Sequence, residues 1–105
     1  MLLEEEKNES PKNPSQAPAQ DFVFYVKNDS VMRNAVDLIS HFGKTENLIL
    51  RARGQSIPNA VAIANILTEK MLRGKSKIQK ITVDSELPEG MERMISKIEI
   101  IISKN

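Results

Sequence analysis

The chain has 105 residues, of which 40% are hydrophobic and 28% are charged, a size and balance typical of one compact domain. The absence of cysteine excludes disulfides, thiolate nucleophiles and cysteine-ligated zinc, and it is compatible with a reducing intracellular compartment. No apolar run approaches the roughly 18 residues needed to span a bilayer, so we expect a cytoplasmic protein without membrane association.

The formal net charge of +1 is unevenly distributed along the chain. Residues 1–20 contain four Glu and two Lys, a net charge of −2, together with three prolines and no apolar periodicity. This composition predicts a disordered acidic tail at 1–20 and a folded domain at 21–105. The domain holds 13 basic and 10 acidic residues, a net charge of +3, which suits a polyanion partner but is less than a dedicated strong DNA binder carries.

A strand and a helix open the folded domain. The apolar and aromatic run at 22–26 is too short for a helix and predicts a buried strand. Asp29 or Ser30 can cap the helix that follows, and Gly43 ends it. Apolar residues recur along this helix at helical spacing, so we expect one of its faces to pack on a sheet.

A second strand is predicted at 48–53, and it runs from apolar into basic residues. Alternation along a strand places Arg51 and Arg53 on the same face. Gly54 then breaks the strand. Two guanidinium groups are therefore expected side by side at a strand end.

The helix predicted at 57–73 has Ser56 as a good N-cap, and it is apolar almost all round between residues 60 and 67. Such a helix is too apolar to have one side on a sheet and the other in water. We therefore expect its outer side to meet another subunit. The residues predicted for this dimer interface are Val61, Ala64, Leu67 and Met71.

Two further strands, at 77–84 and 94–103, finish the chain, and Pro88 and Gly90 mark a hairpin turn between them. The order is then strand, helix, strand, helix, strand, strand. It predicts an α+β two-layer fold, with a four-stranded mixed sheet and both helices on one face.

Residues for catalysis are scarce. The single His41 lies beside Phe42 on the first predicted helix, without a cysteine or a nearby serine and carboxylate at triad-like spacing. The carboxylates show no metal-ligand pattern, and Gly54 lacks the glycine-rich spacing of a nucleotide-binding loop. We therefore expect a protein that is not an enzyme and has no cofactor or metal, with His41 on the helix surface.

Segment 51–59 carries the clearest binding pattern, because it places two arginines and a glycine directly before a helix N-terminus. A guanidinium can hold two phosphate oxygens, and Gly54 lets the backbone approach a ligand closely. Gln55, Ser56 and Asn59 can add neutral hydrogen bonds. The alternative is that the two arginines are solvated charges beside an ordinary cap, and spacing alone does not separate these interpretations.

Two other patterns are more ambiguous. Lys77, Lys80 and Lys97 could extend a basic track, but lysines on an exposed strand more often prevent strands from pairing at an edge. The aromatic residues of the first strand could stack on unpaired bases, yet aromatic residues at such positions are more often core. We favour the structural interpretation for both patterns, with Tyr25 as the expected exception.

A family resemblance covers about residues 21–104. The string RARGQSIPNAVAIANIL, at 51–67, resembles the central signature of the Alba family, which reads approximately KARG, then a small polar turn and an Ile-x-x-Ala-Val helix. Val31 and Met32 resemble the family's Pro-Val-Met helix start, and Ile98-Glu99-Ile100 resembles its closing strand.

The resemblance implies a fold similar to the C-terminal domain of translation initiation factor three, and homodimers or heterodimers with paralogues. It implies sequence-independent binding of double-stranded DNA, and often of RNA, in archaeal chromatin at the nucleoid, through phosphate contacts that salt weakens. The contacts are implied for the first strand–helix loop, the arginine-glycine turn and the hairpin. The residues expected to bind nucleic acid are Lys27, Asn28, Arg33, Arg51, Arg53, Gly54, Gln55, Ser56, Asn59 and Arg93.

This sequence departs from the family pattern in three places. Asn28 and Asp29 stand where the family usually has lysines, which argues against control by lysine acetylation. The hairpin turn is short and acidic, with three glutamates against Arg93, and Met71 replaces a frequent phenylalanine. We expect a divergent paralogue with weaker DNA affinity. The alternatives are an RNA-binding ribonucleoprotein component, and a heterodimer partner with weakened or absent nucleic-acid binding.

Overall fold

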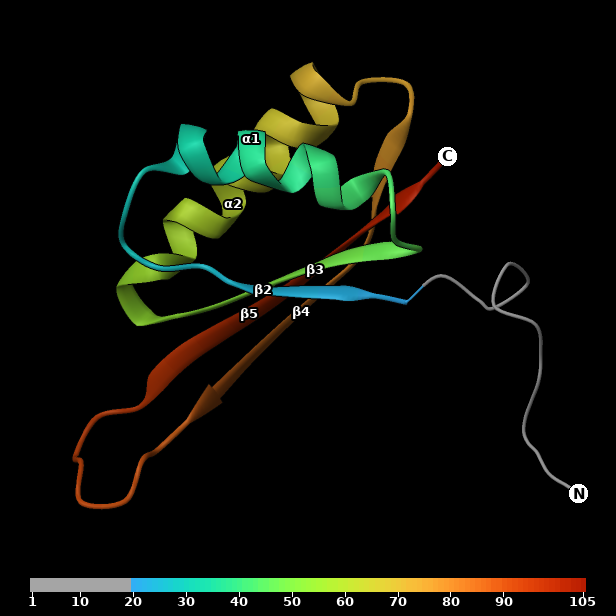
Figure 1. Cartoon of the computed structure of the whole chain (residues 1–105). Helices are drawn as coiled ribbons and strands as arrows, with labels where there is room; N and C mark the ends of the chain where they lie inside the picture. The colour runs from blue at the N-terminus through green and yellow to red at the C-terminus, as the bar shows by residue number, and fades with distance from the viewer. Residues whose placement is uncertain (1–19) are drawn as a thin grey trace, which may run out of the picture.

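The fold described here is a computed structural model that covers residues 20–105 (Figure 1). The predicted acidic tail lies outside the described residues except for Gln20. The order of strands and helices confirms the α+β class. In chain order the elements are β2 (Phe22–Tyr25), α1 (Val31–Phe42), β3 (Asn47–Arg53), α2 (Ile57–Ile66), β4 (Ser76–Glu86) and β5 (Ile95–Lys104).

The four strands form one mixed sheet in the order β2-β3-β5-β4. Strands β2 and β3 are parallel, with Tyr25 opposite Arg51, whereas β5 is antiparallel to both β3 and β4. Both helices cover one face, and the other face, which we call the open face, carries no described helix (Figure 1). Because β2 and β3 are parallel, their carboxyl ends lie at the same end of the sheet. The β2–α1 loop and the arginine-glycine turn after β3, which we call the arginine turn, therefore leave the sheet side by side.

The core lies between the helices and one face of the two central strands. Alternate residues of β3 and β5 point toward the helices and are almost fully buried, while Arg51 and Arg53 point to the open face. Alanines on both helices also belong to this core and are almost fully buried. The largest fully buried side chains are Leu38, Leu48, Leu50, Ile63, Leu67, Ile100 and Ile102.

The two predicted helix caps have different outcomes. Ser30 caps α1 as predicted, because its Oγ accepts a hydrogen bond of 3.2 Å from the backbone N–H of Arg33. The N-cap prediction for Ser56 is wrong: its backbone is already helical, and its side chain makes no capping bond. The reason is a 3-10 turn (Gly54–Ser56) that precedes α2 and starts the helical rise earlier.

The second helix is regular over a shorter range than predicted. After Ile66 the chain continues as a π-helical turn (Leu67–Met71), and Gly74 follows with a φ of +80°. The widened turn keeps Leu67 fully buried and Met71 packed against the core. Leu72 donates its backbone N–H to the backbone oxygen of Leu67, a 2.7 Å bond that closes the turn.

Strand β4 contains a bulge at Gln79. Ile78 pairs with Ile102, but Lys80 pairs with the adjacent residue Ile101, so Gln79 has no partner on β5. Ile78 and Ile81 consequently share the helix side of the sheet although they are three residues apart.

His41 occupies the predicted place on α1 but is half-buried there. Its imidazole stacks on the ring of Phe22, with 3.9 Å between ring centroids and an interplanar angle of 8°. The histidine therefore helps α1 cover the edge strand β2.

Gly54 has a φ of +54°, in the left-handed region that side chains disfavour. An added Cβ would meet only the Cγ2 of Ile95, at an ordinary 3.9 Å, so the cost of a substitution is a backbone cost. We expect Gly54→Ala to lower the free energy of unfolding by about 1 kcal/mol in urea denaturation. Gly43→Ala is the matched control, because Gly43 has a φ of −67° that suits alanine. Equal destabilisation by both variants would contradict the expectation.

Candidate functional site

The loop after β2 and the turn after β3 are joined by Asn59, in the first turn of α2. Its Nδ2 donates a hydrogen bond of 3.1 Å to the backbone oxygen of Lys27, and it lies 3.5 Å from Asn28 Oδ1 and from the backbone oxygen of Asp29. Asn59 thus fixes the β2–α1 loop beside the start of α2. Two predicted binding segments that are distant in the sequence form one edge of the molecule.

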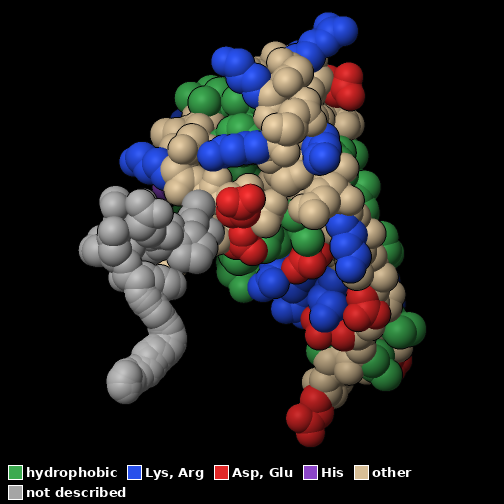
Figure 2. Space-filling view, turned by 90° about the vertical axis from the view of Figure 1, so that its right-hand side faces the viewer, with side chains coloured by type: hydrophobic (Ala, Val, Ile, Leu, Met, Phe, Trp, Pro, Cys, Tyr) green, Lys and Arg blue, Asp and Glu red, His purple; other side chains and the backbone are tan. Residues whose placement is uncertain are grey.

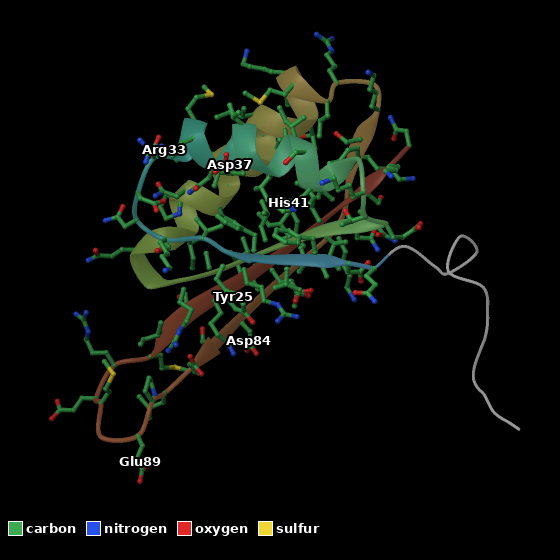
Figure 3. All side chains as sticks on the ribbon, viewed as in Figure 1. Tyr25, Arg33, Asp37, His41, Asp84 and Glu89 are labelled. Carbon is green, nitrogen blue, oxygen red and sulfur yellow. The ribbon has the colours of Figure 1, made fainter. Side chains whose placement is uncertain are left out.

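Three cationic side chains lie on this edge. Lys27 is exposed in the loop, Arg33 is exposed in the first turn of α1, and Arg53 is exposed at the end of β3. Figure 3 shows Arg33 at the loop end of α1, pointing away from the core. The Asp29 carboxylate nearby accepts a 2.8 Å hydrogen bond from Asn34 Nδ2, which orients it within its own loop.

Arg51 lies on the open face and is held by two partners. Its Nε is 2.7 Å from Glu99 Oε2, and its Nη1 donates a 3.3 Å hydrogen bond to the hydroxyl of Tyr25. Tyr25 and Glu99 are both direct register partners of Arg51 on the neighbouring strands. The hydrogen bond to Glu99, and then that to Tyr25, raises the pKa of Arg51 above its ordinary value. Arg51 is therefore part of a cross-strand network.

Arg53 is also paired with a carboxylate. Its Nη2 lies 2.6 Å from Glu86 Oε1, and Glu86 Oε2 lies 3.8 Å from Lys97 Nζ. The predicted common face for the two arginines is thus found in the structure, but each arginine has an acidic partner there.

A groove of about 680 Å³ runs along this part of the open face. Its lining includes three cationic and three anionic side chains, so their formal charges cancel. Tyr25 stands at the groove with 62% of its surface exposed. In Figure 2, basic and acidic side chains are interspersed below the helices on the face in view. The charged lining residues are Arg51, Arg53, Lys97, Asp84, Glu86 and Glu99.

The model of the family named Alba matches residues 23–85, which is more than half of the chain. The chain belongs to the Alba family. The match includes the β2–α1 loop, the arginine-glycine turn and the whole of α2, and it ends before Arg93.

Curated Alba proteins are similar over most of the chain. The DNA/RNA-binding protein Alba of Picrophilus torridus is 29% identical over 90 residues, which are 82% of this chain and 99% of that protein. The protein of the same name from Thermoplasma volcanium is 28% identical over 89 residues, covering 82% of this chain and 99% of the relative.

Two solved Alba structures share the fold. Alba from Thermoplasma volcanium superposes with a TM-score of 0.68 at 28% identity, over 77% of this chain and 98% of that chain. ALBA1 from Trypanosoma brucei superposes with a TM-score of 0.62 at 18% identity, over 85% of this chain and 72% of the other, which shows the fold alone.

Other residues predicted for this Alba-family site lie in different surroundings. Gln55 is exposed in the 3-10 turn, and Ser56 is half-buried beside it. Arg93 is exposed in the hairpin turn, which extends beyond the sheet, as the position of Glu89 in Figure 3 makes visible. The structure thus brings the loop and the arginine turn together and leaves Arg93 on a separate arm.

The residues predicted for a dimer interface fall into two groups. Ala64 and Leu67 are buried in the core of the chain itself, at 1% and 0% exposure. Val61 is 41% exposed, and Met71 is partly buried. Of these four residues, only Val61 and Met71 have surface that a second subunit could touch.

Sequence reasoning missed Glu86 and Glu99 as partners of the arginines. Glu99 carried one signal, because alternation with Ile98 and Ile100 places it on the open face. Its partner is 48 residues away, and the match depends on the register between β3 and β5.

Neither a metal-binding cluster nor a membrane-spanning helix is found among the described residues. Within residues 20–105, no group of three or more acidic, histidine or cysteine side chains is placed to hold a metal ion. Among the described helices, none is both long and apolar enough to cross a bilayer.

Proposed function

We propose that this chain is a chromatin protein that binds double-stranded DNA without sequence preference, as a dimer at the nucleoid, through phosphate contacts. The observation that carries the proposal is the Asn59 bridge, which joins the loop of Lys27 to the arginine turn. The names of the relatives, DNA/RNA-binding proteins at 28–29% identity, support a nucleic-acid ligand.

The proposed contacts follow from the chemistry of the edge. Lys27, Arg33 and Arg53 supply positive charge to the phosphates, and Gly54 and Gln55 expose backbone and amide donors before the N-terminus of α2. Asn59, with Asn28, holds the loop in position rather than reaching far into solvent. Ser56 supports the turn from its half-buried place, and Arg93 would reach a phosphate only from the arm.

Arg51 has a different part in this proposal. Its guanidinium already contacts Glu99 and Tyr25, so it aligns the end of β3 and the ring of Tyr25. Arg53, one pleat further along, is the more exposed of the two arginines and the better phosphate ligand.

We propose that the dimer forms through the helix side of β4 together with Val61 and Met71. Ile78, Ile81 and Val83 form an apolar row on β4 with exposures of 37%, 52% and 71%. Exposed apolar rows of this kind mark association surfaces, and a small domain gains stability by covering them. A second copy or an Alba-like paralogue would fit the same row.

Binding affinity as a function of salt tests the function. We expect the logarithm of the affinity for a labelled DNA duplex to fall linearly with the logarithm of salt concentration, by about 0.9 per phosphate contacted. Duplexes of unrelated sequence should give equal affinities. Absence of binding at the lowest salt would overturn the proposal and favour an interaction module.

RNA is the second candidate ligand, and Tyr25 is the observation that favours it. An aromatic ring that is 62% exposed on an open sheet face, beside an arginine, offers a stacking surface for an unpaired base. A structured RNA that displaces duplex DNA at equal concentration would identify RNA as the preferred ligand.

A further inference from the structure

Glu86 joins two cations across three strands. Its Oε1 lies 2.6 Å from Arg53 Nη2 on β3, and its Oε2 lies 3.8 Å from Lys97 Nζ on β5. Since Glu86 is on β4, its side chain spans the intervening strand β5. The carboxylate of Glu86 therefore pairs with both Arg53 and Lys97 at the same time.

The contacts of Glu86 imitate those of a phosphate. Two oxygens of one anion face an arginine and a lysine, as two oxygens of a phosphodiester would. The three side chains are 38–59% exposed, so solvent and anions reach them. Exposed ion pairs of this kind are weak and exchange readily.

The Arg51–Glu99 ion pair is held in place more firmly than the Arg53–Glu86 ion pair. Arg51 and Glu99 are direct register partners, and Arg51 has a further hydrogen bond to Tyr25. Arg53 and Glu86 are not register partners, because Arg53 pairs with Lys97 and Lys97 pairs with Asp84. The Arg53–Glu86 contact is a diagonal one between two strands that are not neighbours in the sheet.

We propose that Glu86 is an intramolecular competitor, which an anionic ligand must displace before Arg53 and Lys97 can contact its phosphates. This inference rests on the proposed function, and it identifies Glu86 as a group that limits the affinity of the protein for nucleic acid. Because an exposed pair contributes little, removing the carboxylate should raise affinity only about two- to fivefold.

The variants Glu86→Gln and Glu89→Gln separate this mechanism from a general charge effect. Both remove one negative charge, but Glu89 lies in the hairpin turn and makes no ion pair with another residue of 20–105. With a labelled DNA duplex at low salt, we expect Glu86→Gln to bind about two- to fivefold more tightly than the wild type, and Glu89→Gln to change less. Equal gains in the two variants would overturn the competitor role.

A titration with inorganic pyrophosphate gives a readout that does not need nucleic acid. The amide NMR signal of Gly54, next to Arg53, should shift at lower pyrophosphate concentration in Glu86→Gln than in the wild type. If it does while no DNA or RNA binds either protein, the proposed function fails and the role of Glu86 stands. If the two titrations coincide, the role of Glu86 is overturned whatever the result with DNA.

Discussion

Replacing Arg53 by Glu is expected to weaken duplex binding by about tenfold to about a hundredfold. The change removes the proposed charged hydrogen bond to a phosphate and places a carboxylate near both Glu86 and the ligand. Counterion release predicts that the salt slope also becomes shallower by about one for each phosphate that the variant no longer neutralises. The measurement is the affinity for a labelled duplex over a series of salt concentrations.

Arg73→Glu is the matched control for this experiment. Arg73 is exposed after the π-helical turn, at the far end of α2 from the arginine turn, and it undergoes the same change of charge. We expect its affinity to fall less and its salt slope to stay closer to that of the wild type. Equal slopes in the two variants would show that Arg53 makes no phosphate contact of its own.

Val83→Asp is expected to convert the proposed dimer into a monomer. Val83 is 71% exposed in the single chain, so the substitution leaves the packing of the subunit intact. In a two-fold symmetric dimer each copy would bury an unpaired carboxylate, and the dimer dissociation constant should rise by at least about a hundredfold. Light scattering during gel filtration measures the mass.

Val36→Asp controls for the general effect of a valine-to-aspartate change. Val36 is 52% exposed on α1, away from β4 in sequence and in the fold. A variant at this position should remain dimeric. Mixing the chain with an Alba-like paralogue in the same measurement separates a homodimer from a heterodimer. If Val83→Asp keeps the mass of the wild type, the interface does not include the helix side of β4.

Much of the fold follows from local sequence patterns. The spacing of apolar residues in α1, and the alternation in β3 and β5, each depend on neighbours a few residues away, and the structure has these elements where the patterns predict them. Ser30 caps its helix for the same local reason. Ser56 does not, because Gly54 starts a 3-10 turn that the capping pattern does not describe.

The candidate site was only half predictable. The arginines and the loop follow from local sequence, but their partners depend on the register of strands that are distant in the chain. Arg53 and Glu86 meet only because β5 lies between β3 and β4. Likewise, nearly uniform apolarity along α2 does not reveal which residues face the sheet, and Ala64 and Leu67 belong to the inner side.

The bulge at Gln79 determines where the hairpin can point. A bulge bends its strand and increases the local twist, so the direction of residues 87–94 depends on a residue near the start of β4 rather than on the turn. It also reverses which side chains of β4 face the helices beyond that point. Deletion of Gln79 would leave Ile78 opposite Ile102 and Lys80 opposite Ile101, so the bend would be lost and the arm would turn, while its side chains kept their sides of the sheet. A tip of unchanged sequence would then meet a bound partner from a different direction.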